Sequence, residues 1–199
     1  MAANVTITDV VLRDGLQDEP RVTSVQSRQL IAQALVDAGV HDIEAASFVN
    51  PARVPQMVGA EELAAGLLAI PNITWRALAL NAKGVERAVA AGFTDISLVV
   101  SASTAHSQAN SGRSPSDAIR DLTHVVSENP EVTFSGGVAT AFVCPFEGEI
   151  PAEAVLAVAD AYVSIGVDRI GLADTIGTAA PAAVQTTLKT LHRAYPDLA

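Results

Sequence analysis

The sequence holds a single cysteine, Cys144, among its 199 residues. One thiol can form neither an internal disulfide framework nor a thiolate metal cluster. Lysine is almost as scarce: there are two lysines against ten arginines, all of them scattered, and the net charge is −10. A nucleic-acid-binding surface needs a concentrated basic stripe, so this class of function is excluded.

Long hydrophobic runs are also lacking. No apolar run reaches the length of a membrane-spanning helix, and the first ten residues, MAANVTITDV, lack the basic and apolar segments of a signal peptide. We therefore expect a cytoplasmic protein. Hydrophobic residues nevertheless make up 49% of the chain and charged residues only 17%. This composition is enough for one sizeable core and too apolar for disorder.

Short β-branched runs alternate with longer, alanine-rich segments of helical period. The pattern predicts strands over 5–12, 42–48, 73–80, 95–100, within 132–142 and over 169–173. It predicts helices over 24–38, 56–69, 81–91, 115–128, 151–165 and 181–194. A helix end, a glycine, a short loop and a strand recur in the same order over 35–47, 88–101 and 162–175. Repeated βα units imply parallel strands with helical crossovers.

The fold class follows from these units. No glycine-rich dinucleotide-binding sequence follows the first predicted strand, which favours a TIM barrel over a doubly wound sheet. We expect an α/β protein, a partial (β/α)8 TIM barrel of about six βα units that forms a single incomplete domain over 1–199. A closed barrel needs eight strands, so we expect truncation before the seventh, with unpaired strand edges. The alternative is a genuine short protein whose missing edge is supplied by self-association.

Polar side chains follow the C-terminal ends of several predicted strands, where TIM barrels carry their active sites. They are Arg13, Asp14, Glu44, Ser47, Ser101, Ser103, His106, Asp174 and Thr175. Any one of them alone is more often a salt bridge or a hydrogen-bonded cap. Because they gather at the same end of successive strands, together they predict a site.

Five segments resemble hydroxymethylglutaryl-CoA lyase, which belongs to a superfamily of divalent-metal lyases and Claisen condensing enzymes built on TIM barrels. They are LRDGLQDE (12–19), IEAASFVNPARVPQM (43–57), LNAKGVERAVAAG (80–92), CPFEGEI (144–150) and LADTIG (172–177). The resemblance implies a retro-Claisen cleavage of a 3-hydroxy-3-methylglutaryl-CoA-like acyl-CoA to acetyl-CoA and acetoacetate, as in leucine degradation. It also implies Mg²⁺ or Mn²⁺ as the cofactor and an acyl-CoA as the partner.

The resemblance implies roles for individual residues as well. Asp14 corresponds to the carboxylate that ligates the metal, and Arg13 to the arginine that stabilises the enolate at the thioester carbonyl. Glu44 would orient the Arg13 guanidinium by a bidentate contact and so belongs to the catalytic group. The implied substrate-binding residues are Gln17, Ser47, Asn110, Asp174 and Thr175.

The sequence departs from the family in its metal ligands. The family's His-x-His ligand pair has no counterpart, because no two of the four histidines stand two residues apart. The family's asparagine ligand, on the eighth strand, has no counterpart either. Asp14 is then the one family metal ligand present. We therefore expect negligible lyase activity from the isolated chain, and a homo-oligomer formed through exposed edges. Two alternatives stay open: a Claisen condensing enzyme related to isopropylmalate and citramalate synthases, and a non-catalytic fragment.

Overall fold

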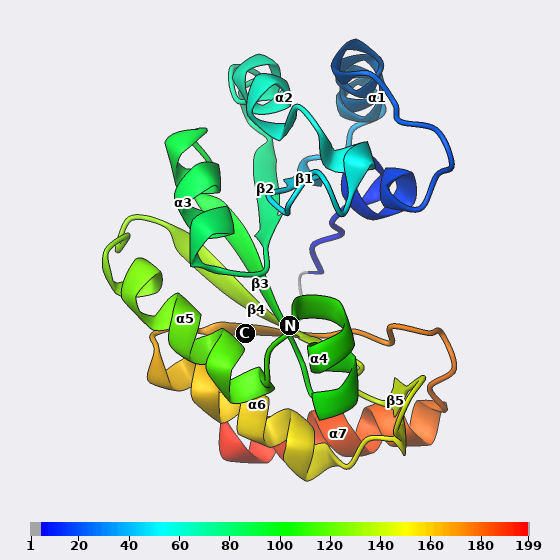
Figure 1. Ribbon diagram of the computed structural model, residues 1–199, viewed down its shortest axis with the longest axis vertical. Helices are drawn as coiled ribbons and strands as arrows, with labels where there is room; N and C mark the ends of the chain where they lie inside the picture. The colour runs from blue at the N-terminus through cyan, green and yellow to red at the C-terminus, as the bar shows by residue number, and fades with distance from the viewer. Residues whose placement is uncertain (1–4, 199) are drawn as a thin grey trace. The chain divides into compact units, whose positions relative to one another are not determined.

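The computed structural model describes residues 5–198 (Figure 1). Its main sheet has five strands in the order β1-β2-β3-β4-β7. Strand β1 pairs in parallel with β2, and β4 pairs in parallel with β7. Helices connect the successive strands, as parallel pairing requires. The predicted α/β fold, a partial TIM barrel, is confirmed.

Most elements lie close to their predicted ranges. The strands are β1 (Asp42–Ser47), β2 (Thr74–Ala79), β3 (Asp95–Ser101), β4 (Thr133–Ala139), β5 (Val143–Cys144), β6 (Gly148–Glu149) and β7 (Arg169–Leu172). The helices are η1 (Val11–Gly15), α1 (Val25–Asp37), η2 (Pro55–Met57), α2 (Ala60–Leu67), α3 (Ala82–Ala90), α4 (Thr104–Ser111), α5 (Pro115–Ser127), α6 (Ala152–Ser164) and α7 (Pro181–Ala194). The sequence pattern predicts neither α4 nor the small antiparallel β5–β6 pair.

The predicted strand over 5–12 is wrong. Only Asp9 joins the sheet edge, through a single parallel bridge to Ile43. The physical reason is the Asp9 side chain, whose Oδ1 accepts the Val11 amide at 2.9 Å and turns the chain. The Val10 carbonyl then accepts three successive amides of the π-helical turn η1. Arg13 and Asp14 therefore stand on a helical turn and not at the end of a strand.

Backbone contacts divide the chain into two compact units. The first comprises Met1–Ala79, Lys83–Ile96 and Glu131–Thr133, and the second comprises Leu80–Ala82, Ser97–Pro130 and Phe134–Ala199. The single domain over 1–199 stays a prediction. In the core of the first unit, the Phe48 and Phe93 rings meet edge to face at 5.6 Å, and the Arg87 guanidinium lies 5.5 Å from the centre of the Phe48 ring. Such aromatic and cation–π contacts add to the burial of apolar area.

In the second unit, helix α6 packs closely against β4. A Cβ atom at Gly136 would lie 2.7 Å from the ring of Tyr162, so glycine is what allows this approach. Tyr162 is completely buried, and its hydroxyl donates to the Gly137 carbonyl at 3.3 Å. Burial raises the pKa of Tyr162 far above its ordinary value. The phenol therefore remains a hydrogen-bond donor.

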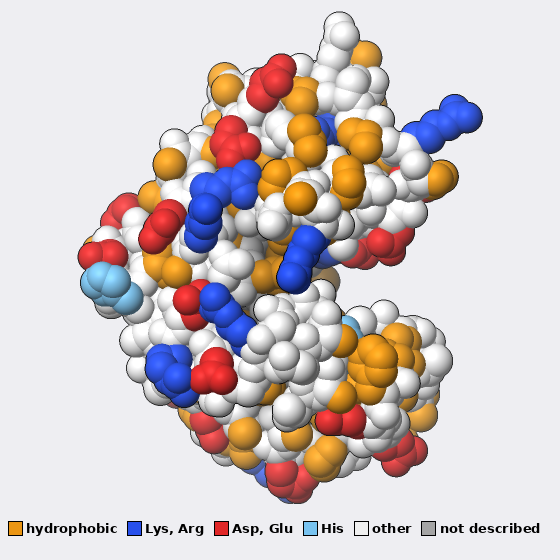
Figure 2. Space-filling model, viewed as in Figure 1, with side chains coloured by type: hydrophobic (Ala, Val, Ile, Leu, Met, Phe, Trp, Pro, Cys, Tyr) orange, Lys and Arg blue, Asp and Glu red, His pale blue; other side chains and the backbone are white. Residues whose placement is uncertain are grey.

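No helix within residues 5–198 combines the length and the apolar character needed to cross a bilayer. On the face drawn in Figure 2, lysine and arginine side chains stand apart from one another, several of them beside acidic side chains. Arg87 pairs with Glu61 at 2.6 Å, and Arg113 pairs with Asp121 at 2.7 Å. Each of these arginines is thus committed to an ion pair within its own unit.

Candidate active site

Three charged side chains meet in the first unit, where η1 lies against β1. Arg13 donates from Nε to Glu44 Oε2 at 2.6 Å and from Nη1 to Asp14 Oδ1 at 2.5 Å. The side chain of Glu44 is 7% exposed, that of Arg13 18% and that of Asp14 60%. A carboxylate as buried as Glu44 is tolerable only because it is paired. The guanidinium is therefore held on two of its nitrogens, between a buried and an exposed carboxylate.

This geometry differs from the expectation in two respects. Glu44 holds Arg13 by one hydrogen bond and not by a bidentate contact, and Asp14 takes a second nitrogen of the same guanidinium. Arg13 and Asp14 also form an ion pair with each other. The resemblance implies instead that Asp14 faces a metal cation and Arg13 a developing oxyanion. Within residues 5–198, Nη2 of Arg13 and Oδ2 of Asp14 have no hydrogen-bond partner. Both groups are therefore available to a ligand.

Two further predicted site residues lie in the first unit. Ser47 ends β1 and is 1% exposed, yet its Oγ has no hydrogen-bond partner within the described residues. An unsatisfied buried hydroxyl costs about 1–3 kcal/mol, so a group that satisfied it on binding would gain affinity. Gln17 follows η1 and is partly exposed. Its segment is tied to η2 by the side-chain amide of Gln56, which donates to the Glu19 carbonyl at 2.9 Å.

In the second unit, Asp174 and Thr175 follow β7 and are exposed. The Asp174 carboxylate accepts the amides of Thr178 at 3.2 Å and Ala179 at 2.9 Å, so it caps the loop that leads to α7. Thr175 Oγ1 accepts the Thr140 amide at 2.7 Å. Both residues thus have structural partners, and the hydroxyl hydrogen of Thr175 has no acceptor among the described residues.

Helix α4 carries the remaining candidates. Asn110 lies in its last turn and is exposed. His106 lies in its first turn, and its Nδ1 is buried with no hydrogen-bond partner within the described residues. Burial lowers the pKa of His106 below its ordinary value. Its ring centre lies 6.4 Å from that of Phe146. Burial of this partly exposed imidazole therefore favours its neutral form.

Sequence reasoning missed one carboxylate near this helix. Glu147 Oε1 accepts the Ala105 amide at 3.1 Å, and hydrogen bonds from Ser103 and from this amide hold the pKa of Glu147 below its usual range. Ser103 caps α4 by accepting the His106 amide at 2.9 Å, and it accepts the Cys144 thiol at 3.0 Å. The sequence signal was the CPFEGEI segment itself, whose glutamate follows the cysteine by three residues.

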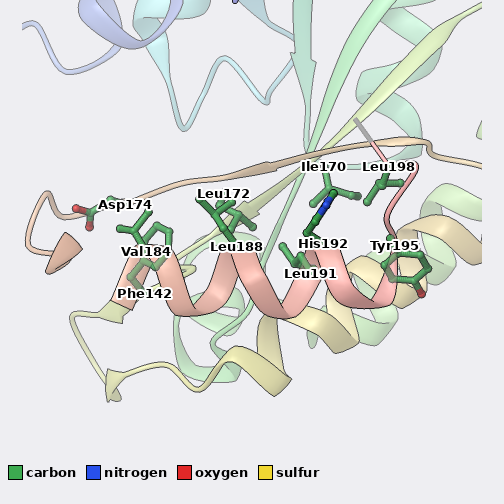
Figure 3. A pocket seen from close by; sticks show the side chains of 10 residues that line it. All are labelled: Phe142, Ile170, Leu172, Asp174, Val184, Leu188, Leu191, His192, Tyr195 and Leu198. Carbon is green, nitrogen blue, oxygen red and sulfur yellow. The ribbon is translucent and has the colours of Figure 1, made fainter. Parts of the chain in front are cut away.

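A groove of about 470 Å³ lies between β7 and α7 in the second unit (Figure 3). It is lined mainly by apolar side chains: Phe142, Ile170, Leu172, Val184, Leu188, Leu191 and Leu198. In Figure 3, Leu188 and Leu191 come from α7 and Ile170 from β7, with Asp174 at one end of the row. Asp174 is the one predicted site residue among the residues that line this groove.

The implied divalent metal can be tested against the donor set. Within residues 5–198, no three histidine, cysteine, aspartate or glutamate side chains stand close enough together to hold a metal ion. Mg²⁺ needs near-octahedral oxygen coordination, usually from one or two carboxylates together with waters and substrate oxygens. Asp14 supplies one carboxylate, and one of its oxygens is occupied by Arg13. The described residues do not by themselves complete the implied site.

The chain has parallel strands with helical crossovers, and polar side chains lie at the ends of β1 and β3 and directly after β7. These features define part of a (β/α)8 barrel of the kind that carries its site at the strand ends. A family model described as HMGL-like matches residues 4–199. The chain therefore belongs to the HMGL-like family.

Individual relatives agree with this placement. The chain is 37% identical to (R)-citramalyl-CoA lyase of Chloroflexus aurantiacus, over 98% of this chain and 65% of the relative. It is 33% identical to hydroxymethylglutaryl-CoA lyase YngG of Bacillus subtilis, over 96% of this chain and 65% of the relative. It superposes with a TM-score of 0.91 and 34% identity on an HMG-CoA lyase from Acinetobacter baumannii in complex with coenzyme A and 3-methylmalate, covering 95% of this chain and 62% of that one. The chain thus spans somewhat less than two thirds of these relatives.

Proposed function

We propose that this chain carries the enolate-stabilising part of an acyl-CoA lyase, which cleaves a 3-hydroxy-3-methylglutaryl-CoA-like thioester to acetyl-CoA and acetoacetate. The observation that supports this most is Arg13, held by Glu44 and Asp14 with Nη2 left unpartnered among the described residues. A retro-Claisen cleavage moves an electron pair onto the thioester carbonyl oxygen. A fixed cationic donor beside that oxygen lowers the barrier because charge develops there.

The tertiary hydroxyl loses its proton and becomes the ketone of acetoacetate, the adjacent C–C bond breaks, and the enolate takes up a proton to give acetyl-CoA. Nη2 of Arg13 would donate to the thioester oxygen, while Glu44 fixes the orientation of the guanidinium. The Oγ of Ser47, which has no partner among residues 5–198, would hydrogen-bond the acyl group. Further substrate contacts are proposed for Gln17, Asn110, Asp174 and Thr175.

Asp14 would contribute one carboxylate to Mg²⁺ or Mn²⁺, and the described residues do not complete such a site. We therefore assign no step of the cleavage to a metal on this chain. We expect the isolated chain to bind an acyl-CoA and to cleave it at a negligible rate.

The identity to (R)-citramalyl-CoA lyase favours a second candidate substrate. Citramalyl-CoA has the same thioester and the same methyl-bearing tertiary hydroxyl, with its carboxylate one methylene closer. Its cleavage by the same route would give acetyl-CoA and pyruvate. One methylene in a fitted pocket is worth about 1–3 kcal/mol, so the affinities of the two substrates should differ measurably.

Isothermal titration calorimetry of the 199-residue chain tests this proposal. The ligands are hydroxymethylglutaryl-CoA, citramalyl-CoA, acetyl-CoA with a 2-keto acid, and coenzyme A alone, each in the presence of Mg²⁺. We expect one of the first two to bind about ten-fold more tightly than coenzyme A, as one charge-assisted hydrogen bond would provide. Equal affinity for all four would contradict the proposal. A preference for acetyl-CoA with a 2-keto acid would instead indicate a condensing enzyme.

We also infer that the chain self-associates. Strand β7 ends the order of the main sheet, and an unpaired strand edge is a ready template for another strand. Leu188, in the groove beside it, is 50% exposed. Light scattering coupled to size-exclusion chromatography should give a dimer or a larger species at micromolar concentration. A monodisperse monomer would contradict this inference.

A further inference from the structure

Thr140, which directly follows β4, has a backbone conformation that threonine rarely adopts. Its φ is 51°, in the left-handed region, and its side chain is completely buried. For a β-branched residue this conformation costs on the order of 1–3 kcal/mol, and it persists only where the surroundings hold it. The question is therefore what holds Thr140 and what its conformation provides.

Three hydrogen bonds hold the residue, all within the second unit. Its amide donates to Thr175 Oγ1 at 2.7 Å, and its own Oγ1 lies 2.7 Å from Ser101 Oγ and 2.7 Å from the Ala139 carbonyl. A hydroxyl has one hydrogen, and a carbonyl can only accept. The Thr140 hydrogen therefore goes to Ala139, and Ser101 must donate to Thr140. Ser101 Oγ in turn accepts the Ser103 amide at 3.1 Å.

The result is a directed chain that links the ends of three parallel strands. It runs from the Ser103 amide through Ser101, at the end of β3, to Thr140 after β4. The Thr140 amide then reaches Thr175, which follows β7. Because Thr175 Oγ1 uses a lone pair for this amide, its own hydrogen is left to donate, and Thr175 is exposed.

We propose that Thr140 is a positioning residue, whose left-handed backbone and buried hydroxyl hold Thr175 so that its hydroxyl donates to an oxygen of the acyl-CoA substrate. The Thr140 amide donates to Thr175, and the Thr140 hydroxyl oxygen accepts a hydrogen bond from Ser101, so this one residue links both partners. This inference rests on the proposed function for the identity of the ligand. The hydrogen bonds that it invokes can be measured without any ligand.

The first test measures hydrogen exchange of the Thr140 amide by NMR in the ligand-free chain. Thr175→Val removes the acceptor and keeps the shape, so the Thr140 amide should exchange about ten-fold faster, as the loss of one hydrogen bond predicts. Thr175→Ser keeps the oxygen and should restore the slow exchange. The Ala141 amide, which donates to the Ala173 carbonyl at 3.1 Å, is the internal control and should not change. Equal exchange of the Thr140 amide in wild type and Thr175→Val would overturn the proposal.

The second test measures the affinity for hydroxymethylglutaryl-CoA or citramalyl-CoA. Thr140→Gly keeps the amide, removes the hydroxyl and is free to leave the left-handed region. It should bind about ten-fold more weakly at a temperature where it remains folded, while Thr140→Ser binds nearly as wild type does. A merely structural residue would change the melting temperature and leave this affinity intact, and that result would overturn the proposal.

Two safeguards keep the outcomes distinct. If Thr140→Gly does not fold, Thr140→Asn takes its place, because asparagine tolerates the left-handed region and lacks the hydroxyl. If the wild-type chain binds no acyl-CoA, the proposed function fails. The exchange of the Thr140 amide then still decides whether this residue holds Thr175.

Discussion

Nε of Arg13 lies 2.6 Å from Oε2 of Glu44, a carboxylate within a strand that is buried along its whole length. A charge in such a strand is stable only with its partner, so the pair fixes the position of the guanidinium as well as that of the carboxylate. Glu44 therefore anchors Arg13 to the core of the first unit, while the exposed Asp14 holds a second nitrogen of the guanidinium.

Replacing Glu44 by glutamine tests this relationship, because it removes the charge and keeps the shape. We expect Glu44→Gln to lower the free energy of unfolding by about 1–3 kcal/mol, below the 3–5 kcal/mol of a fully buried pair because Arg13 is partly exposed. The matched control is Glu61→Gln, which breaks the pair with Arg87 at the same 2.6 Å but with Glu61 50% exposed. Exposed pairs contribute about 0–1 kcal/mol. Equal losses in urea unfolding would contradict the dependence on burial.

Gly136 should tolerate no side chain. A Cβ atom there would lie 2.7 Å from the ring of the buried Tyr162, which has no room to move away. We expect Gly136→Ala to lower the free energy of unfolding by about 1–3 kcal/mol through overpacking. Gly171 is the control, since nothing lies within 4 Å of a Cβ built there. Urea unfolding monitored by circular dichroism separates the two, and equal stability of both variants would show that α6 and β4 pack less closely than described.

Burial of His106 makes the stability depend on pH. Its pKa in the folded chain lies below the ordinary 6.5, because burial disfavours the charged imidazolium. As the pH falls through about 6.5, this histidine takes up a proton in the unfolded chain, whereas in the folded chain it does so only at a lower pH. The free energy of unfolding therefore decreases as the pH drops below about 6.5. We expect His106→Gln to lose less stability than wild type between about pH 7.5 and pH 5.5.

Unfolding by urea at both pH values measures this difference. His41→Gln, a change at an exposed histidine, is the comparison variant. A pH dependence in His106→Gln as steep as that of wild type would show that His106 does not contribute to it.

Regular elements could be predicted where local pattern and caps agree. The pattern predicts a helix over 24–38, and α1 runs from Val25 to Asp37. Ser24 accepts the Ser27 amide at 3.1 Å at its start, and Gly39, at a φ of 88°, follows its end. Ser47 at the end of β1, and Asp174 and Thr175 after β7, could be predicted for a similar reason. The end of each strand is visible in the sequence, and barrels place their polar side chains there.

What could not be predicted depends on side chains acting on the backbone. The predicted strand over 5–12 is wrong because one hydrogen bond, from the Val11 amide to the Asp9 side chain, turns the chain away from the sheet. Helix α4 is not predicted because its sequence, TAHSQANS, lacks an apolar face, and the helix depends on its N-cap at Ser103. The left-handed Thr140 leaves no trace in the sequence, since its partners lie 39 and 35 residues away.

The most direct test of the central claim measures whether Arg13 recognises the thioester carbonyl oxygen. The affinity of the chain for an acyl-CoA is compared with its affinity for the matched thioether, which lacks that oxygen, in wild type, Arg13→Met and the control Arg21→Met at an exposed arginine. Wild type and Arg21→Met should prefer the thioester by about ten-fold, as one charge-assisted hydrogen bond provides, and Arg13→Met should show no preference. A preference that survives in Arg13→Met, or one that is absent from wild type, would contradict the account.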